Sequence, residues 1–144
     1  MVRTNRDEPP VIARGHLDQA REWVLRATGD FGDLFWLLEV VDVEGCDSGA
    51  HGSPGGPALG DGSLYLSGSG PGAGDVMVWT ALTSPDAVRA RLLLVDGALE
   101  MAVVAQDVVD DVRFFIREAP RADVVGAVAL SATGQEVARS RLPR

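Results

Sequence analysis

Short runs of alternating apolar and polar residues, separated by turn residues, fill residues 76–142 of the chain. In residues 87–95, Val88, Ala90, Leu92 and Leu94 alternate with polar or charged positions that include Arg89 and Arg91. Asp96-Gly97 follows, and residues 98–106 resume the alternation with Leu99 and Met101. A period of two places the apolar set on one face of a strand, and Asp-Gly between two such runs predicts a β-hairpin.

The same pattern predicts further strands in this half of the chain. They cover residues 76–82, 87–95, 98–106, 112–118, 123–131 and, after Thr133-Gly134, 135–142. Turn signals about 8 to 12 residues apart are typical of antiparallel sandwiches. We therefore expect an all-β, antiparallel β-sandwich of Ig-like or related type, with about seven or eight strands.

The first half of the chain is less regular. Residues 16–28 fit both a helix and a strand, since apolar residues recur at helical spacing while Trp23, Leu25 and Ala27 alternate; we favour the strand. Residues 34–43 are aromatic and β-branched, as in a buried strand. Residues 45–75 hold 11 of the 17 glycines, which predicts a long disordered loop with one short edge strand at residues 63–67. Residues 1–10 are expected to form a flexible tail before a single domain over 11–144.

Charge narrows the range of partners. The net charge is −8, all 13 bases are arginine, and residues 30–111 contain 14 acids against two bases. Such an acidic middle repels nucleic acid and anionic membranes and favours cations or basic partners. No apolar run reaches the length of a membrane span and residues 1–10 lack a signal-peptide core, so we expect a cytoplasmic protein, or an exported one if a leader was removed.

Several segments together resemble known domains: Ala13-Arg14-Gly15, Glu22-Trp23-Val24-Leu25, the glycine-rich segment, Val112-Arg113-Phe114-Phe115-Ile116 with Ala119-Pro120, and residues 128–136. The arrangement resembles small uncharacterised β-sandwich domains of actinobacteria, which are often secreted or membrane-tethered. The resemblance implies a β-sandwich without known catalytic residues. Relatives often carry paired cysteines around the insert, whereas this chain has only Cys46, which cannot form an internal disulfide.

Two groups of residues are candidates for cation binding. Asp107, Asp110 and Asp111 cluster between two expected strands, and gathered carboxylates suit a hard cation such as Ca²⁺, although a turn also requires polar residues for solvation alone. The histidines His16 and His51 lie in different segments and would have to converge to bind zinc.

A possible partner-binding surface lies on residues 112–117. There, Val112, Phe114 and Ile116 share one face of a strand, which leaves Arg113, Phe115 and Arg117 on the other. Aromatic residues and arginine are enriched at protein interfaces, so these three side chains are candidates for partner binding; alternatively, Phe115 is covered by another part of the domain.

Arg139 and Arg141 alternate in the same way on the last expected strand and form a small basic strip opposite the acidic middle. Such a dipolar molecule can bind a charged partner or a second copy of itself. We find no catalytic set and expect no cofactor, because no nucleophile elbow or phosphate loop with its lysine is present. We therefore expect a non-enzymatic binding module that contacts a protein, with a cation-binding or hydrolytic domain as the alternative.

Overall fold

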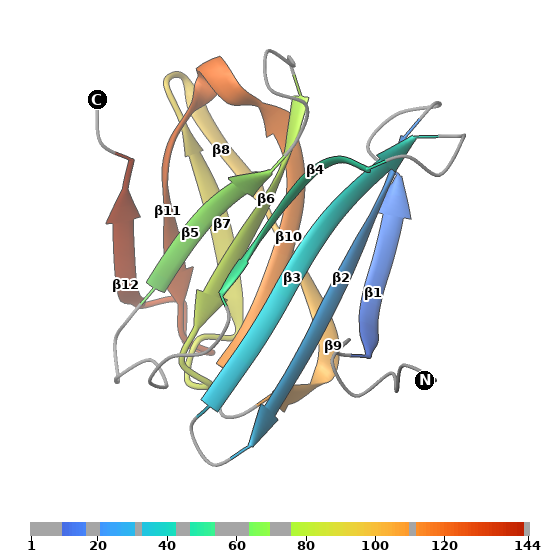
Figure 1. The fold of residues 1–144 in the computed structure, drawn as a ribbon. Helices are drawn as coiled ribbons and strands as arrows, with labels where there is room; N and C mark the ends of the chain where they lie inside the picture. Colours follow the sequence, from blue (N-terminus) through green and yellow to red (C-terminus); the bar gives the residue numbers. More distant parts are fainter. Residues whose placement is uncertain are drawn as a thin grey trace, which may run out of the picture.

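A computed structural model describes residues 10–16, 21–30, 33–42, 47–53, 64–69, 76–109 and 112–142. Only the backbone is described for residues 29–30, 33–35, 42, 47–53, 69 and 105–109. The described residues form three four-stranded antiparallel sheets (Figure 1). The expected all-β, sandwich-like fold is therefore confirmed.

Sheet A is built from consecutive strands paired in chain order. It contains β1 (Val11–His16), β2 (Arg21–Asp30), β3 (Asp33–Asp42) and β4 (Asp47–Ser53). The ambiguous segment 16–28 is a strand over most of its described length, because β2 pairs with β3 from Arg21 opposite Asp42 to Asp30 opposite Asp33. Trp23, Leu25 and Ala27 face the core, as the period-two interpretation predicts.

Strand β4 corrects one expectation about the glycine-rich segment. Residues 47–53 belong to the predicted loop, yet they form a strand that pairs with β3. The backbone of a glycine-rich strand can still pair fully in a ladder, although glycine brings no side-chain packing. The predicted strand at residues 63–67 is confirmed as β5 (Leu64–Ser69), while 54–63 and 70–75 lie outside the described residues, as do residues 1–9 of the predicted tail and Cys46.

Sheets B and C come from the second half of the chain and β5. Sheet B has the order β5, β6 (Val76–Thr83), β10 (Val112–Pro120) and β9 (Ala102–Val109). Sheet C has the order β12 (Glu136–Arg141), β11 (Val124–Leu130), β7 (Arg89–Leu94) and β8 (Gly97–Glu100). A short 3-10 helix, η2 (Arg121–Asp123), joins β10 to β11.

The expected single strand over residues 98–106 is divided between the two sheets. Residues 97–100 pair with β7 in sheet C, whereas residues 102–109 pair with β10 in sheet B. Met101, buried between them, donates its N–H to the carbonyl oxygen of Ala90 at 2.9 Å. This division, β1 and β4 account for most of the difference between the twelve strands of the described residues and the seven or eight expected.

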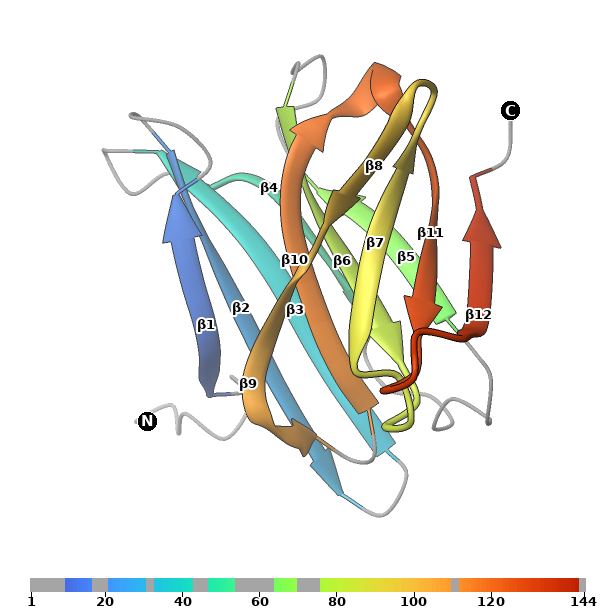
Figure 2. The same cartoon turned by 180° about the vertical axis from the view of Figure 1, so that it is seen from behind.

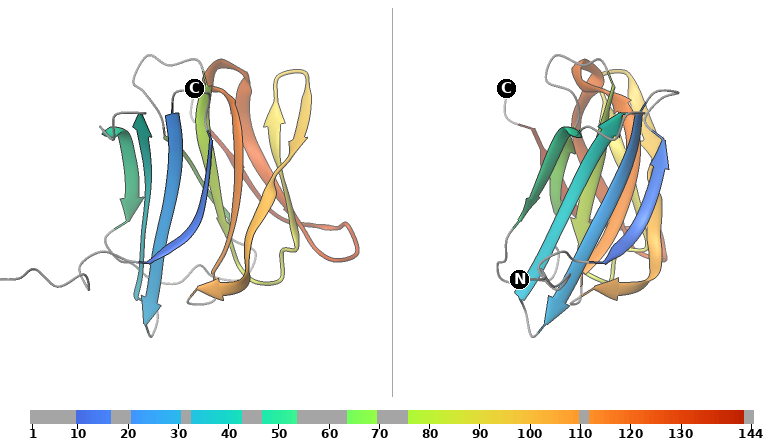
Figure 3. Two further views of the ribbon diagram at one scale, coloured as in Figure 1. Left: turned by 90° about the vertical axis from the view of Figure 1, so that its right-hand side faces the viewer. Right: turned by 45° about the vertical axis from the view of Figure 1, so that its right-hand side comes forward.

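Sheet B is the middle of three layers, as the edge-on view in the left panel of Figure 3 shows. One face packs on sheet A through a core that includes Trp23, Trp36 and Phe114. The opposite face packs on sheet C through a second core that includes Trp79, Leu92 and Phe115. Neighbouring residues of β10 therefore enter different cores. Phe114, Phe115 and Ile116 follow one another without a polar residue because both faces of this strand are buried.

Candidate functional site

The outer face of sheet C carries a set of charged side chains that turn away from both cores. Sheet C lies nearest the viewer in Figure 2. One row of paired residues crosses its four strands in the order Arg139, Val128, Arg91 and Glu100. We use the name arginine face for the outward charged residues of this sheet, which are Arg89, Arg91, Arg139, Arg141, Glu100 and Glu136.

Alternation in the strands explains why these side chains point outward. Ala90 and Leu92 of β7 are completely buried, so Arg89 and Arg91 lie on the opposite side of the strand. On β12, buried Ala138 precedes exposed Arg139. Val128 also belongs to the outer face but is only 6% exposed; it lies between Arg91 and Arg139, whose aliphatic stems can cover an apolar neighbour.

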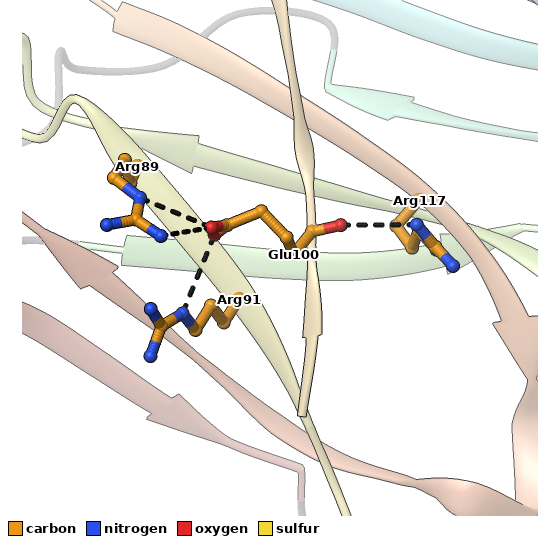
Figure 4. Close-up of polar contacts among 4 residues, drawn as sticks. All are labelled: Arg89, Arg91, Glu100 and Arg117. Carbon is orange, nitrogen blue, oxygen red and sulfur yellow. Dashed lines mark hydrogen bonds and ion pairs between the residues drawn. The ribbon is translucent and has the colours of Figure 1, made fainter. Parts of the chain in front are cut away.

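Glu100 holds two of these arginines together. Its Oε1 accepts hydrogen bonds from Nε of Arg89, at 3.2 Å, and from Nη2 of the same side chain, while its Oε2 lies 3.6 Å from Nε of Arg91 (Figure 4). Each carboxylate oxygen thus faces a different guanidinium group. The three side chains keep between 42% and 49% of their surface exposed, so the cluster stays in contact with water.

The backbone at Glu100 is also fixed. Nη1 of Arg117, on the neighbouring strand β10, donates to the carbonyl oxygen of Glu100 at 3.4 Å (Figure 4). Met101, the next residue, is anchored in the core between the sheets. The position of the Glu100 carboxylate is therefore set by the point at which the chain passes from sheet C to sheet B.

A second ion pair lies on the last strand. Nη2 of Arg139 donates to Oε1 of Glu136 at 2.7 Å. This hydrogen bond from Arg139 lowers the pKa of the Glu136 carboxyl, and the same contact raises the pKa of Arg139. Arg141 forms no ion pair with any described residue, so the arginine face carries four guanidinium groups against two carboxylates.

Exposed valines mark the two ends of β7. Val95, in the turn of the β7–β8 hairpin, is 67% exposed, and Val88, just before β7, is 39% exposed. Single exposed apolar residues are ordinary on protein surfaces.

The structure separates the three residues predicted to bind a partner through β10. Phe115 is completely buried between sheets B and C, so its ring is not available at the surface; the alternative, in which another part of the domain covers it, describes its position. Arg113 donates from Nη2 to the carbonyl oxygen of Pro85 at 3.2 Å, and Arg117 donates to Glu100. Only Arg117 contacts the arginine face.

The predicted cation ligands fall largely outside the described residues. The backbone of Asp107 lies in β9, at the edge of sheet B, whereas Asp110 and Asp111 lie outside. The described part of the chain contains no group of three or more His, Cys, Asp or Glu residues that could hold a metal ion. The Ca²⁺ site therefore stays a prediction, which thermal melting with added Ca²⁺ can test.

The two histidines lie on different strands of sheet A. His16 ends β1 and His51 lies in β4, and these are the two edge strands of the sheet. Three strand spacings separate the edges, about 14 Å. His51 pairs with Leu38 and Leu38 with Leu25, whereas His16 pairs with Glu22, so the two histidines are also offset by about 10 Å along the strands. The two offsets together exceed the reach of two imidazole side chains around one zinc ion, since a zinc–nitrogen bond is about 2 Å long.

Sequence reasoning recognised Arg139 and Arg141 as a basic strip but missed the cluster around Glu100. The hairpin register contained the signal: Leu94 pairs with Gly97, so counting outward places Arg91 opposite Glu100. The turn residues are Val95 and Asp96, one position earlier than Asp-Gly suggests. Counting from the correct turn would have identified this pair from the sequence.

Comparisons with known proteins assign no relative to this arrangement. No family model, no curated protein and no solved structure matches the chain. Among the described residues, no helix has the length and apolar content required to cross a membrane.

Proposed function

We propose that this chain is a non-enzymatic binding module that contacts a protein partner through the arginine face. The observation that carries the proposal is the presence of four arginines on the outer face of one sheet, opposed by only two described carboxylates. Arginine is enriched at protein interfaces, where its planar group forms several hydrogen bonds at once. The matching surface of the partner is acidic.

The fold itself has little need of these charges. Ion pairs between exposed side chains usually contribute about 0 to 1 kcal/mol to stability, so Glu100 and Glu136 do not explain why four arginines gather here. The core between sheets B and C lies on the other side of sheet C and contains its buried apolar residues, among them Ala90, Leu92 and Ala127. Partner binding explains the gathering of four arginines on this surface, whereas their contribution to stability does not.

The net charge of −8 does not oppose local binding of an acidic surface. Screening limits charge interactions to about 8 Å at physiological ionic strength, so the nearest side chains dominate. A second copy of this chain is also an acidic partner, because its net charge is −8. Association of two copies would join the arginine face of one copy to acidic residues outside that face on the other.

Paired variants test the proposal. Arg139→Gln with Arg141→Gln removes two charges from the arginine face, and Arg14→Gln with Arg121→Gln removes two exposed charges elsewhere. We expect proteins from a lysate of the native organism to be retained by the wild type and the second variant but not by the first, with sedimentation velocity reporting self-association of the purified chain. Equal retention by both variants, or no specific retention by the wild type, would reject the proposal.

A further inference from the structure

The two oxygens of the Glu100 carboxylate face different arginines, so two guanidinium groups lie around one carboxylate. Arg89 contacts Oε1 through Nε and Nη2, and Arg91 approaches Oε2. The two guanidinium groups project from alternate residues of one strand, so their spacing is set by the backbone. A planar group with two anionic oxygens fits between them, as a carboxylate does.

We propose that Arg89 and Arg91 form a binding site for an Asp or Glu side chain of a protein partner, and that Glu100 occupies this site in the free protein. This inference rests on the proposed function and names the chemistry of the contact. A partner carboxylate would replace that of Glu100, so binding exchanges one ion pair for another. Glu100 thereby acts as an internal competitor that weakens binding.

The exposure of the cluster makes such an exchange feasible. The side chains of Arg89, Arg91 and Glu100 are each more than 40% exposed, so a partner can reach them and Glu100 can rotate into water. Exposed pairs of this kind are weak, which means that the competitor is displaced at small cost. The backbone of Glu100 stays in place because Arg117 holds its carbonyl group and Met101 is buried.

Charge elsewhere on the chain favours an acidic protein segment over longer polyanions. A nucleic acid or an anionic membrane would extend beyond the face and meet a molecule of net charge −8. A short segment with a few carboxylates meets mainly the arginine face, where Arg141 offers a further guanidinium group without an ion pair among the described residues. We therefore assign an Asp- or Glu-rich peptide segment as the occupant.

The test measures binding of a fluorescein-labelled oligoglutamate peptide by anisotropy at fixed ionic strength. Glu100→Gln removes the competitor, and the control Glu22→Gln removes one exposed negative charge from sheet A, outside the arginine face. We expect Glu100→Gln to tighten binding about fivefold and Glu22→Gln to change it less than about twofold. The gain should vanish when Glu100→Gln is combined with Arg89→Gln and Arg91→Gln.

Three results would overturn the inference. They are equal tightening by Glu100→Gln and Glu22→Gln, a gain that persists without the two arginines, and equally tight binding of an oligothymidylate or of phosphatidylserine vesicles to the Glu100→Gln variant. Failure of the proposed function gives a different result, because the peptide would then bind equally well to the wild type and to variants lacking Arg89 and Arg91 or Arg139 and Arg141. Matching melting temperatures confirm that the variants are folded.

Discussion

Trp23 and Trp79 donate their indole N–H groups to consecutive residues of β10 from opposite sides of the middle sheet. Nε1 of Trp23 donates to Oε2 of Glu118 at 2.8 Å, and Nε1 of Trp79 donates to the carbonyl oxygen of Ala119 at 3.0 Å. Trp23 belongs to the core between sheets A and B, and Trp79 to the core between B and C. One short stretch of β10 is therefore tied to both cores.

Loss of the indole hydrogen bond should lower the free energy of unfolding by different amounts at Trp79 and Trp23. Trp79→Phe leaves a buried carbonyl oxygen without its donor, an effect of about 1 to 3 kcal/mol in addition to the lost ring contacts. Trp23→Phe frees a carboxylate that is only partly buried and can turn toward water. Urea denaturation followed by circular dichroism should show the larger loss for Trp79→Phe, and a larger loss for Trp23→Phe would contradict this assignment.

A glycine lies opposite each of these tryptophans. Gly15 pairs with Trp23 and Gly68 with Trp79, and a Cβ added to either would lie 2.6 Å or 2.8 Å from the indole ring. We expect Gly68→Ala to displace the ring of Trp79 and to cost about 1 to 3 kcal/mol, because overpacking a core strains its neighbours. The control is Gly97→Ala, where nothing lies within 4 Å of the added Cβ.

Denaturation of the two alanine variants checks this prediction, together with the emission spectrum of the tryptophans. Gly97→Ala should leave both nearly unchanged. If Gly68→Ala proved as stable as Gly97→Ala, the close contact between Gly68 and Trp79 would not describe the folded protein.

Two buried threonines on β6 form a second matched pair. The hydroxyl of Thr80 finds no hydrogen-bond partner among the described residues, whereas Thr83 donates from Oγ1 to the carbonyl oxygen of Ser84 at 3.0 Å. Thr80→Val should leave stability unchanged or raise it by about 1 kcal/mol, since it removes an unsatisfied buried group. Thr83→Val should lower stability by about 1 kcal/mol. Thermal or urea unfolding measures both, and the opposite order would refute the prediction.

The contact between Glu136 and Arg139 predicts a dependence on pH. The hydrogen bond from Arg139 lowers the pKa of Glu136 in the folded protein below its value in the unfolded chain, about 4.3. The stabilising effect is therefore fully present above that value and is lost as the pH falls through the folded pKa. Carboxyl titration by NMR should show the pKa of Glu136 rising toward its ordinary value in Arg139→Gln. An unchanged pKa in that variant would show that the pair is not formed in solution.

For a strand with one buried face, the sequence predicts which side chains point to the core. For a strand buried on both faces, it does not. The alternation of β7 and the presence of a hairpin to β8 follow from residues 87–100, and the buried face of β7 follows with them, although the turn lies one position earlier than predicted. On β10 the same rule predicted an outer face for Phe115, although sheet C covers it. A strand in the middle layer buries both faces, so alternation alone does not reveal which face meets solvent.

Strand β4 and the cluster at Glu100 escaped prediction for different reasons. Residues 47–53 have too few large side chains to show the alternation of apolar and polar residues that marks a strand. They pair with β3 through backbone hydrogen bonds, which leave no such pattern in the sequence. The contact of Glu100 with Arg89 and Arg91 depends on the exact register of a hairpin, which a shift of one residue in the assumed turn destroys.

The crossing at Met101 also limits how the molecule can open. Residues 97–109 run from sheet C into sheet B without interruption, so the two layers are joined covalently along that side. No ladder connects β5 with β12, the described strands at the opposite side (Figure 1). Because residues 84–88 and η2 cross between the same two sheets, the chain passes from one layer to the other three times, so sheet C cannot detach from sheet B without disrupting the core between them.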